Sequence, residues 1–183
     1  MSTLETNLIQ PATGTTLTVG ASGDQITAAT GVKTSFLYPA FEANLSSNQT
    51  SVADNTATKV QFNSEVFDTG GCYDNSSNYR FTPTTAGKYF VYAYIVGGAG
   101  GGNADNKDMQ IAIYKNGSSV KFLHNLTNTG YENEIDVTIH NTIDMDGSSD
   151  YLEIFGTINS VANSGSNEFL ADECTFGAYR IGT

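Results

Sequence analysis

Three aspartates within seven residues are the closest approach to a metal site in this sequence. Asp144, Asp146 and Asp150 surround Gly147, and hard cations such as calcium need several oxygen ligands at close range. The spacing differs from that of an EF-hand, and no glutamate occupies the closing position. Asp and Gly are also the residues that tight turns select for their backbone geometry. The sequence therefore favours a turn and leaves calcium binding as the alternative.

The other reactive residues do not form a recognisable catalytic set. His124 and His140 are the only histidines, and the Gly-x-Ser-x-Gly elbow of a serine hydrolase is absent from the sequence. The glycine run 97–102 lacks the Lys-Ser/Thr ending of a phosphate loop, and we expect it to form a flexible connection between strands. Cys72 and Cys174 are too few for a disulfide framework or a zinc site. We expect buried free thiols, with a single bridge as the alternative, and we predict that the chain is not an enzyme.

The charge balance excludes several classes of partner. The 183 residues carry 8 Lys and Arg against 19 Asp and Glu, a formal net charge of -11. Nucleic-acid binding needs clustered basic residues, and so does attraction to an anionic membrane. No segment approaches the roughly 20 apolar residues of a membrane helix, and the first residues lack the basic start and apolar run of a signal peptide. We therefore expect no nucleic acid, no membrane insertion and no standard secretory route.

Period-2 alternation begins at Ser35 and predicts strands separated by Gly, Asn and Asp turns. No window has helical periodicity with caps. Several short strands with regular turn signals indicate an all-β sandwich or jelly roll. The predicted strands are 35–45, 58–68, 78–82, 87–96, 108–115, 119–124, 133–143, 150–157 and 174–181.

The segment before Ser35 differs from the rest. Residues 1–34 contain short apolar patches between Gly, Pro, Thr and Ser, and no aromatic residue precedes Phe36. Such a segment buries too little surface to fold alone. We predict two parts: an anchoring or trimerising arm over 1–34 and a head over 35–183. A floppy tail is the alternative for the arm.

The predicted strand 87–96 is apolar or aromatic on both faces. Tyr89, Val91, Ala93 and Ile95 alternate with residues of the second face, which are Phe90, Tyr92, Tyr94 and Val96. A strand with one face in water should instead alternate with polar residues. A neighbouring subunit could cover the second face, and Phe90, Tyr92 and Tyr94 are then interface residues. A thick single sandwich is the alternative explanation.

Six short motifs follow one another from Pro39 onward. They are Pro39-Ala40-Phe41-Glu42-Ala43, Val60-Gln61-Phe62-Asn63 with Gly70-Gly71-Cys72-Tyr73-Asp74-Asn75, Phe81-Thr82-Pro83 through Gly87-Lys88-Tyr89-Phe90, Ile111 through Tyr114-Lys115-Asn116-Gly117, Asp144 through Ile154, and Thr175-Phe176-Gly177-Ala178-Tyr179-Arg180-Ile181. No single motif is specific, but their order resembles that of the C1q-like branch of the C1q/TNF superfamily. The resemblance implies a ten-stranded antiparallel jelly roll and a homotrimer. The glycine run 97–102 and the insertion near 160–167 depart from the family pattern, and its collagen stalk is absent.

A second resemblance concerns the arm. Residues 17–27, LTVGASGDQIT, resemble arms that precede receptor-exposed heads in structural proteins of tailed phages. This implies a virion-surface protein, made in the host cytoplasm, that acts as a fibre, an appendage or a capsid decoration. Its partners would be two further copies, other virion proteins through the arm, and a host-surface glycan or protein.

The sequence does not identify a receptor site. Exposed side chains at predicted loop tips, Tyr73, Asn75, Asn78 and Tyr131, could contact carbohydrate or protein, although turn chemistry is the favoured explanation. The alternative functions are a cellular C1q-like adhesin or soluble lectin and, more remotely, a capsular polysaccharide depolymerase, which would need a carboxylate cleft.

Overall fold

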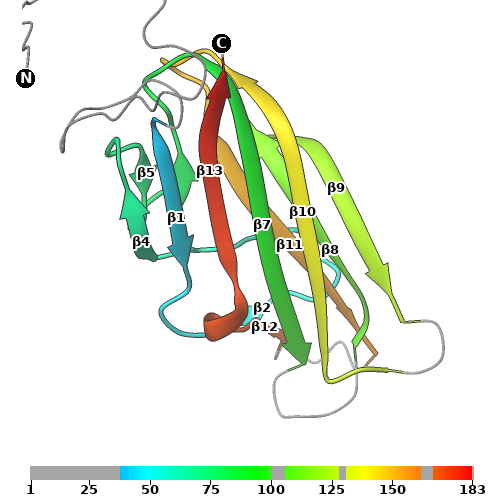
Figure 1. Ribbon diagram of the computed structural model, residues 1–183. Helices are drawn as coiled ribbons and strands as arrows, with labels where there is room; N and C mark the ends of the chain where they lie inside the picture. The colour runs from blue at the N-terminus through cyan, green and yellow to red at the C-terminus, as the bar shows by residue number, and fades with distance from the viewer. Residues whose placement is uncertain (1–37, 100–105, 128–130, 162–166, 183) are drawn as a thin grey trace, which may run out of the picture. The chain divides into compact units, whose positions relative to one another are not determined.

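The computed structural model describes residues 38–99, 106–127, 131–161 and 167–182, which belong to one compact unit (Figure 1). The predicted arm lies outside the described residues, so the boundary between arm and head stays a prediction. The described strands are β1 (Ala40–Asn44), β2 (Gln49–Val52), β3 (Thr58–Lys59), β4 (Ser64–Asp68), β5 (Tyr73–Asp74), β6 (Arg80–Phe81), β7 (Gly87–Ala99), β8 (Asn106–Lys115), β9 (Ser118–Leu126), β10 (Glu134–Met145), β11 (Leu152–Ser160), β12 (Asn167–Phe169) and β13 (Thr175–Gly182). A single 3-10 turn, η1 (Ala171–Glu173), precedes β13.

These strands form two antiparallel sheets packed face to face. The first, which we call the inner sheet, has the order β2-β12-β7-β13-β1-β4, with β10 paired to β7. The second, the outer sheet, has the order β5-β6-β11-β8-β9, with β3 paired to β11. Figure 1 shows β1, β13, β7 and β10 in one layer, with β11, β8 and β9 in the layer behind it. The all-β jelly-roll sandwich predicted from the sequence is confirmed.

Strict alternation of side chains explains why β10 forms an inner-sheet strand. Ile135, Val137, Ile139, Ile143 and Met145 are buried, while most of the residues between them are polar and exposed. A period of two places all five side chains on the face that meets the outer sheet. Each such burial contributes about 1.5–3 kcal/mol to folding.

An aromatic cluster fills one end of the core between the sheets. The ring of Phe41 on β1 stacks on Tyr73 and Phe81, with centroid distances of 4.5 and 4.6 Å, and meets the edge of Phe176 at 4.8 Å. Offset and edge-to-face pairs of this kind each add about 0.5–1.5 kcal/mol beyond the burial of area. The cluster packs β1, the first described strand, against β13, the last one.

The strand count differs from the predicted ten, because thirteen strands occur in the described residues. The predicted strand 58–68 is interrupted: β3 pairs with β11 in the outer sheet, and β4 pairs with β1 in the inner sheet. The short strands β2, β5 and β12 were missed, since two to four mostly polar residues give no detectable alternation.

The glycine run predicted as a strand connection begins inside a strand. β7 continues through Gly97 and Gly98 to Ala99, where it pairs with β12 and β10. A Cβ atom at Gly97 would lie 2.8 Å from Ile158 and 2.9 Å from Met109. Glycine is therefore required here by close packing against the outer sheet, and the rest of the run lies outside the described residues.

Candidate functional site

The open face of the inner sheet carries a group of aromatic side chains, which we call the β7 face. It consists of Glu42, Phe90, Tyr92, Tyr94, His140 and Tyr179, drawn from β1, β7, β10 and β13. The other side of β7 is fully in the core, where Tyr89, Val91 and Ile95 are buried. The two-faced character predicted for this strand is thus present. The predicted interface residues Phe90, Tyr92 and Tyr94 lie on the same open face, and all three are partly exposed.

Neighbouring rings on the β7 face contact each other across the strands. Phe90 lies 5.9 Å from the His140 ring, nearly parallel to it, and 5.4 Å from the Tyr179 ring. Tyr92 lies 6.3 Å from Phe90 along the strand. Cross-strand aromatic pairs stabilise a sheet and hold side chains flat against it. The rings of Phe90, Tyr92, His140 and Tyr179 therefore form one preformed cluster on the face.

A hydrogen bond across three strands orients Tyr92. Its hydroxyl donates to Glu42 Oε2 at 2.6 Å, passing over Gly177 of β13. A Cβ atom at Gly177 would lie 2.4 Å from Tyr92 Cζ and Oη, so only glycine leaves room for the ring. Burial raises the pKa of Tyr92, and the hydrogen bond and charge of Glu42 raise it further. The hydroxyl therefore stays protonated and continues to donate at physiological pH.

The loop between β10 and β11 is a hydrogen-bonded turn. Asp146 Oδ1 accepts the backbone N–H groups of Ser148, Ser149 and Asp150 at 2.8–2.9 Å. Hydrogen bonds from these residues, first of all from Asp150, hold the pKa of Asp146 well below its usual value. Gly147 has φ +72, in the left-handed region that favours glycine.

The three aspartates of this loop have separate partners. Asp144 forms an ion pair with Lys88 at 2.6 Å, and Asp150 forms one with Lys115 at 2.8 Å. In the part of the chain that the structure describes, no three His, Cys, Asp or Glu side chains are placed to hold a metal ion. The contacts are those of the turn interpretation, and the calcium alternative gains no support from the geometry.

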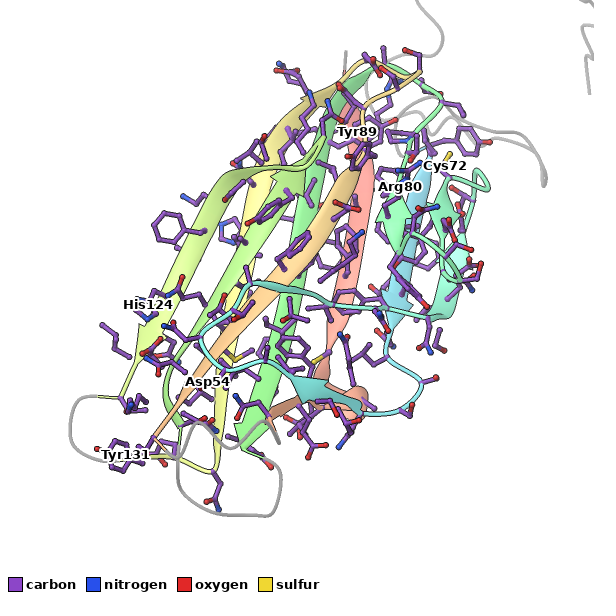
Figure 2. All side chains as sticks on the ribbon, turned by 180° about the vertical axis from the view of Figure 1, so that it is seen from behind. Asp54, Cys72, Arg80, Tyr89, His124 and Tyr131 are labelled. Carbon is purple, nitrogen blue, oxygen red and sulfur yellow. The ribbon has the colours of Figure 1, made fainter. Side chains whose placement is uncertain are left out.

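The cysteines and histidines are not arranged for nucleophilic catalysis. Cys72 and Cys174 are both free and buried, as the sequence predicts. Burial raises the pKa of Cys174 to about 11, so its thiol is protonated near neutral pH. The histidines have other partners: His124 Nε2 lies 2.9 Å from Asp108 Oδ1 on the outer sheet, and the His140 ring stacks on Phe90. Figure 2 shows His124 on the outer sheet, away from Cys72.

The loop-tip residues have different roles from one another. The prediction of an exposed Tyr73 is wrong, because this side chain is only 7% exposed and its hydroxyl donates to the Phe62 carbonyl at 2.8 Å. Asn78 is exposed, and its amide donates to Asp74 within a turn. Asn75 is half-buried. Tyr131 is 52% exposed, and Figure 2 shows it near the end of the sandwich.

A groove on the outward face of the outer sheet was missed by the sequence analysis. We call it the outer groove, and its volume is about 190 Å³. Half-buried side chains of β8 and β11 and exposed side chains of β9 line most of it, together with Ala57 before β3. The lining side chains include Gln110, Ala112, Tyr114, Ser119, Phe122, Phe155 and Thr157. The available signal was the set of apolar residues Val120, Phe122, Leu123 and Leu126 in this strand, since exposed apolar side chains are unusual on an edge strand in water.

Comparison with known proteins supports the fold. The globular domain of zebrafish complement 1qA protein superposes with a TM-score of 0.54 at 12% identity, over 78% of this chain and 97% of that chain. Murine APRIL, from a crystal structure at pH 5.0, superposes with a TM-score of 0.55 at 8% identity, over 78% of this chain and 98% of that chain. No protein-family model matches the chain, and no curated protein matches it in sequence.

The fold is therefore a C1q/TNF-like jelly roll. The identities of 12% and 8% are too low to transfer a function from either structure. None of the described residues forms a helix long and apolar enough to cross a membrane.

Proposed function

We propose that this domain is the head of a homotrimeric, non-enzymatic structural protein on the surface of a tailed-phage virion. In this proposal, three heads pack through the β7 face, residues 1–34 attach the protein to the particle, and the outward surfaces bind the host. The β7 face is the observation that carries the trimer. The arm resemblance, which lies outside the described residues, supports the virion location.

The β7 face has the composition of a protein interface. Its centre is formed by Phe90, Tyr92 and Tyr94, and aromatic residues are enriched at the centres of protein interfaces. Rings held in place by cross-strand contacts lose little conformational freedom on binding. A threefold ring closes through heterologous contacts, in which one part of the β7 face meets a different part of the next head. An aromatic face on an open sheet is thus best explained by partial burial in an oligomer.

The absence of a catalytic arrangement within the described residues agrees with a binding or structural role. The two thiols are buried, and each histidine is paired or stacked with a different group. A fold alone does not define a function, so the function has to be argued from individual sites on the head. The surfaces of the head are therefore where host contact is expected.

The oligomeric state tests the trimer directly. The full chain should elute as a trimer in size-exclusion chromatography with light scattering at micromolar concentration. Tyr94→Asp should dissociate it, because a charge buried without a partner is costly. Tyr131→Asp is the matched control, since Tyr131 is exposed and lies outside the β7 face. A stable wild-type monomer, or a trimer unaffected by Tyr94→Asp, would contradict the proposal.

Attachment to the particle tests the arm. A chain lacking residues 1–34 should fold as a head but fail to join virions. If the truncated chain assembled at the normal copy number, the head would be the attachment surface, and the roles of the two parts would be reversed. Imaging the protein in intact virions distinguishes a fibre from a capsid decoration.

A further inference from the structure

We propose that the outer groove binds a neutral pyranose ring of a glycan. The inference rests on the outward-binding part of the proposed function, for which it names a site and a class of ligand. It starts from three side chains that lie side by side across the outer sheet. Phe122 of β9 pairs with Ala112 of β8, and Ala112 pairs with Phe155 of β11.

This register creates a slot with an apolar floor. Ala112 is the smallest of the three side chains, so the space above it stays open between two aromatic residues. Adjacent strands are about 4.8 Å apart, which separates the strands of Phe122 and Phe155 by roughly 9–10 Å. Phe155 leans on Tyr114, with ring centroids 4.1 Å apart, so one wall is a pair of rings. The dimensions suit one saturated ring inserted between the walls.

Phe122 is exposed to a degree that calls for an explanation. It is 64% exposed, the highest value among the exposed large apolar side chains of the described residues. The negative face of an aromatic ring attracts the weakly positive C–H groups of another ring. A pyranose presents such C–H groups on its face and hydroxyl groups around its edge. Stacking of the sugar on Phe122 would therefore cover apolar surface while the hydroxyls remain in contact with polar groups.

The polar side chains of the groove are available for such hydroxyls. Gln110 and Thr157 pair across β8 and β11, next to the slot, and Ser119 lies on β9. None of these three side chains makes a hydrogen bond to another described residue. An amide and two hydroxyls offer both donors and acceptors, which matches sugar hydroxyls. A few placed polar groups on an apolar lining is the usual composition of a small-ligand site.

Charge selects among the possible sugars. No charged side chain lines the groove, and the chain as a whole carries a formal charge of -11. An anionic glycan would be repelled by this net charge, and the ammonium of Lys59, which lies 5.9 Å from the Phe155 ring, is already paired with Glu153. The volume of about 190 Å³ is below that of pockets for drug-sized ligands, so a single neutral ring is the expected occupant.

The groove stays accessible in the proposed trimer. The β7 face is on the inner sheet, whereas the groove is on the outward side of the outer sheet. Three heads would thus present three grooves. A weak affinity for one ring could then be raised by multivalent contact with a repeating glycan.

Saturation-transfer NMR on the full chain provides the test. The probes are the methyl pyranosides of glucose, galactose, mannose and N-acetylglucosamine. At least one should receive saturation, with a Kd in the millimolar range typical of about -4 kcal/mol. Phe122→Ala and Gln110→Ala should each weaken binding about tenfold, and Ala112→Leu should abolish it by filling the slot. Phe67→Ala is the matched control, because Phe67 is an exposed phenylalanine on β4 of the other sheet.

Several outcomes would overturn the proposal. One is no saturation of any of the four glycosides, and another is binding that survives both Phe122→Ala and Ala112→Leu. A proline-rich peptide is tested in parallel, because aromatic grooves also bind such segments. Peptide binding that is lost in Ala112→Leu, without sugar binding, would assign the groove to a protein partner. Light scattering on the same samples reports the trimer separately, so the failure of either proposal is distinguishable from failure of the other.

Discussion

The two aromatic surfaces of this domain differ in how their polar groups are satisfied. On the β7 face, the Tyr92 hydroxyl is bonded to Glu42 and the rings contact one another. In the outer groove, the Phe122 ring contacts no other aromatic ring of the described residues, and Gln110 has no hydrogen-bond partner among them. The paired Tyr92 hydroxyl can be covered by protein at little desolvation cost. A hollow with unpaired groups is suited to a ligand that supplies the partners.

The loop from Asp144 to Asp150 joins the two sheets that carry these surfaces. It leaves β10 of the inner sheet and enters β11 of the outer sheet. Asp144 pairs with Lys88 of β7, and Asp150 pairs with Lys115 of β8. Changes in this loop should therefore affect both surfaces equally, whereas changes within one surface should affect that surface alone.

The largest effect is expected for Gly147→Val. A Cβ atom here would lie 2.2 Å from the Ala86 nitrogen, at a φ of +72 that valine resists. The strain and the collision with backbone should lower the free energy of unfolding by about 1–3 kcal/mol or more. Urea denaturation measures this change. An unaltered midpoint would show that the loop does not hold the two sheets together.

The next effect in size is expected for Gly177→Val, which acts on the β7 face alone. The added side chain would displace the Tyr92 ring, break its hydrogen bond to Glu42 and change the shape of the β7 face. We expect loss of the trimer in light scattering and a destabilisation of about 1–3 kcal/mol. Sugar binding in the outer groove should persist.

Gly98→Ala is the control for this substitution. A Cβ atom at Gly98 would meet the Asn133 oxygen at 3.5 Å, an ordinary contact. The control should keep the trimer. A trimer that also survived Gly177→Val would show that the β7 face does not mediate assembly.

The sequence predicted the β7 face better than the outer groove. Strand 87–96 is long, and its second apolar face was a visible departure from alternation, so the β7 face could be proposed from spacing alone. Its partner residues His140 and Tyr179 could not, because their proximity depends on the register of β10 and β13. The same limit hid the outer groove, where Phe122 and Phe155 are 33 positions apart and meet only through Ala112.

The loop tips illustrate a different limit. Tyr73 follows a glycine pair, which indicates an exposed turn, but it packs beside Phe41 in the core. Turn chemistry predicts where the backbone bends and does not predict which side chain points inward.

A matched pair of phenylalanine-to-alanine substitutions compares the two surfaces directly. Phe90→Ala removes a ring that contacts His140 and Tyr179, so it should lower stability by about 1 kcal/mol and weaken the trimer. Phe122→Ala removes a mostly exposed ring and should change stability by less than about 0.5 kcal/mol. Thermal denaturation and light scattering measure both effects. If Phe122→Ala were the more damaging substitution, the assignment of the two surfaces would be reversed.

The smallest effect at neutral pH is expected for Asp146→Asn, which separates the turn from a metal site. Asparagine can still accept hydrogen bonds from the N–H groups of Ser148, Ser149 and Asp150, so the melting temperature at pH 7 should change little.

The stability of the wild type and of Asp146→Asn should differ at acid pH, because hydrogen bonds from the loop lower the pKa of Asp146 in the folded state. A carboxylate with a lowered folded pKa contributes stability above its usual pKa of about 3.9 and loses it as the pH falls further. Asparagine does not titrate, so the variant should lose less stability than the wild type below about pH 4. Denaturation curves between neutral and acid pH measure this difference, and a calcium-dependent rise in melting temperature that vanished in Asp146→Asn would instead establish a metal site.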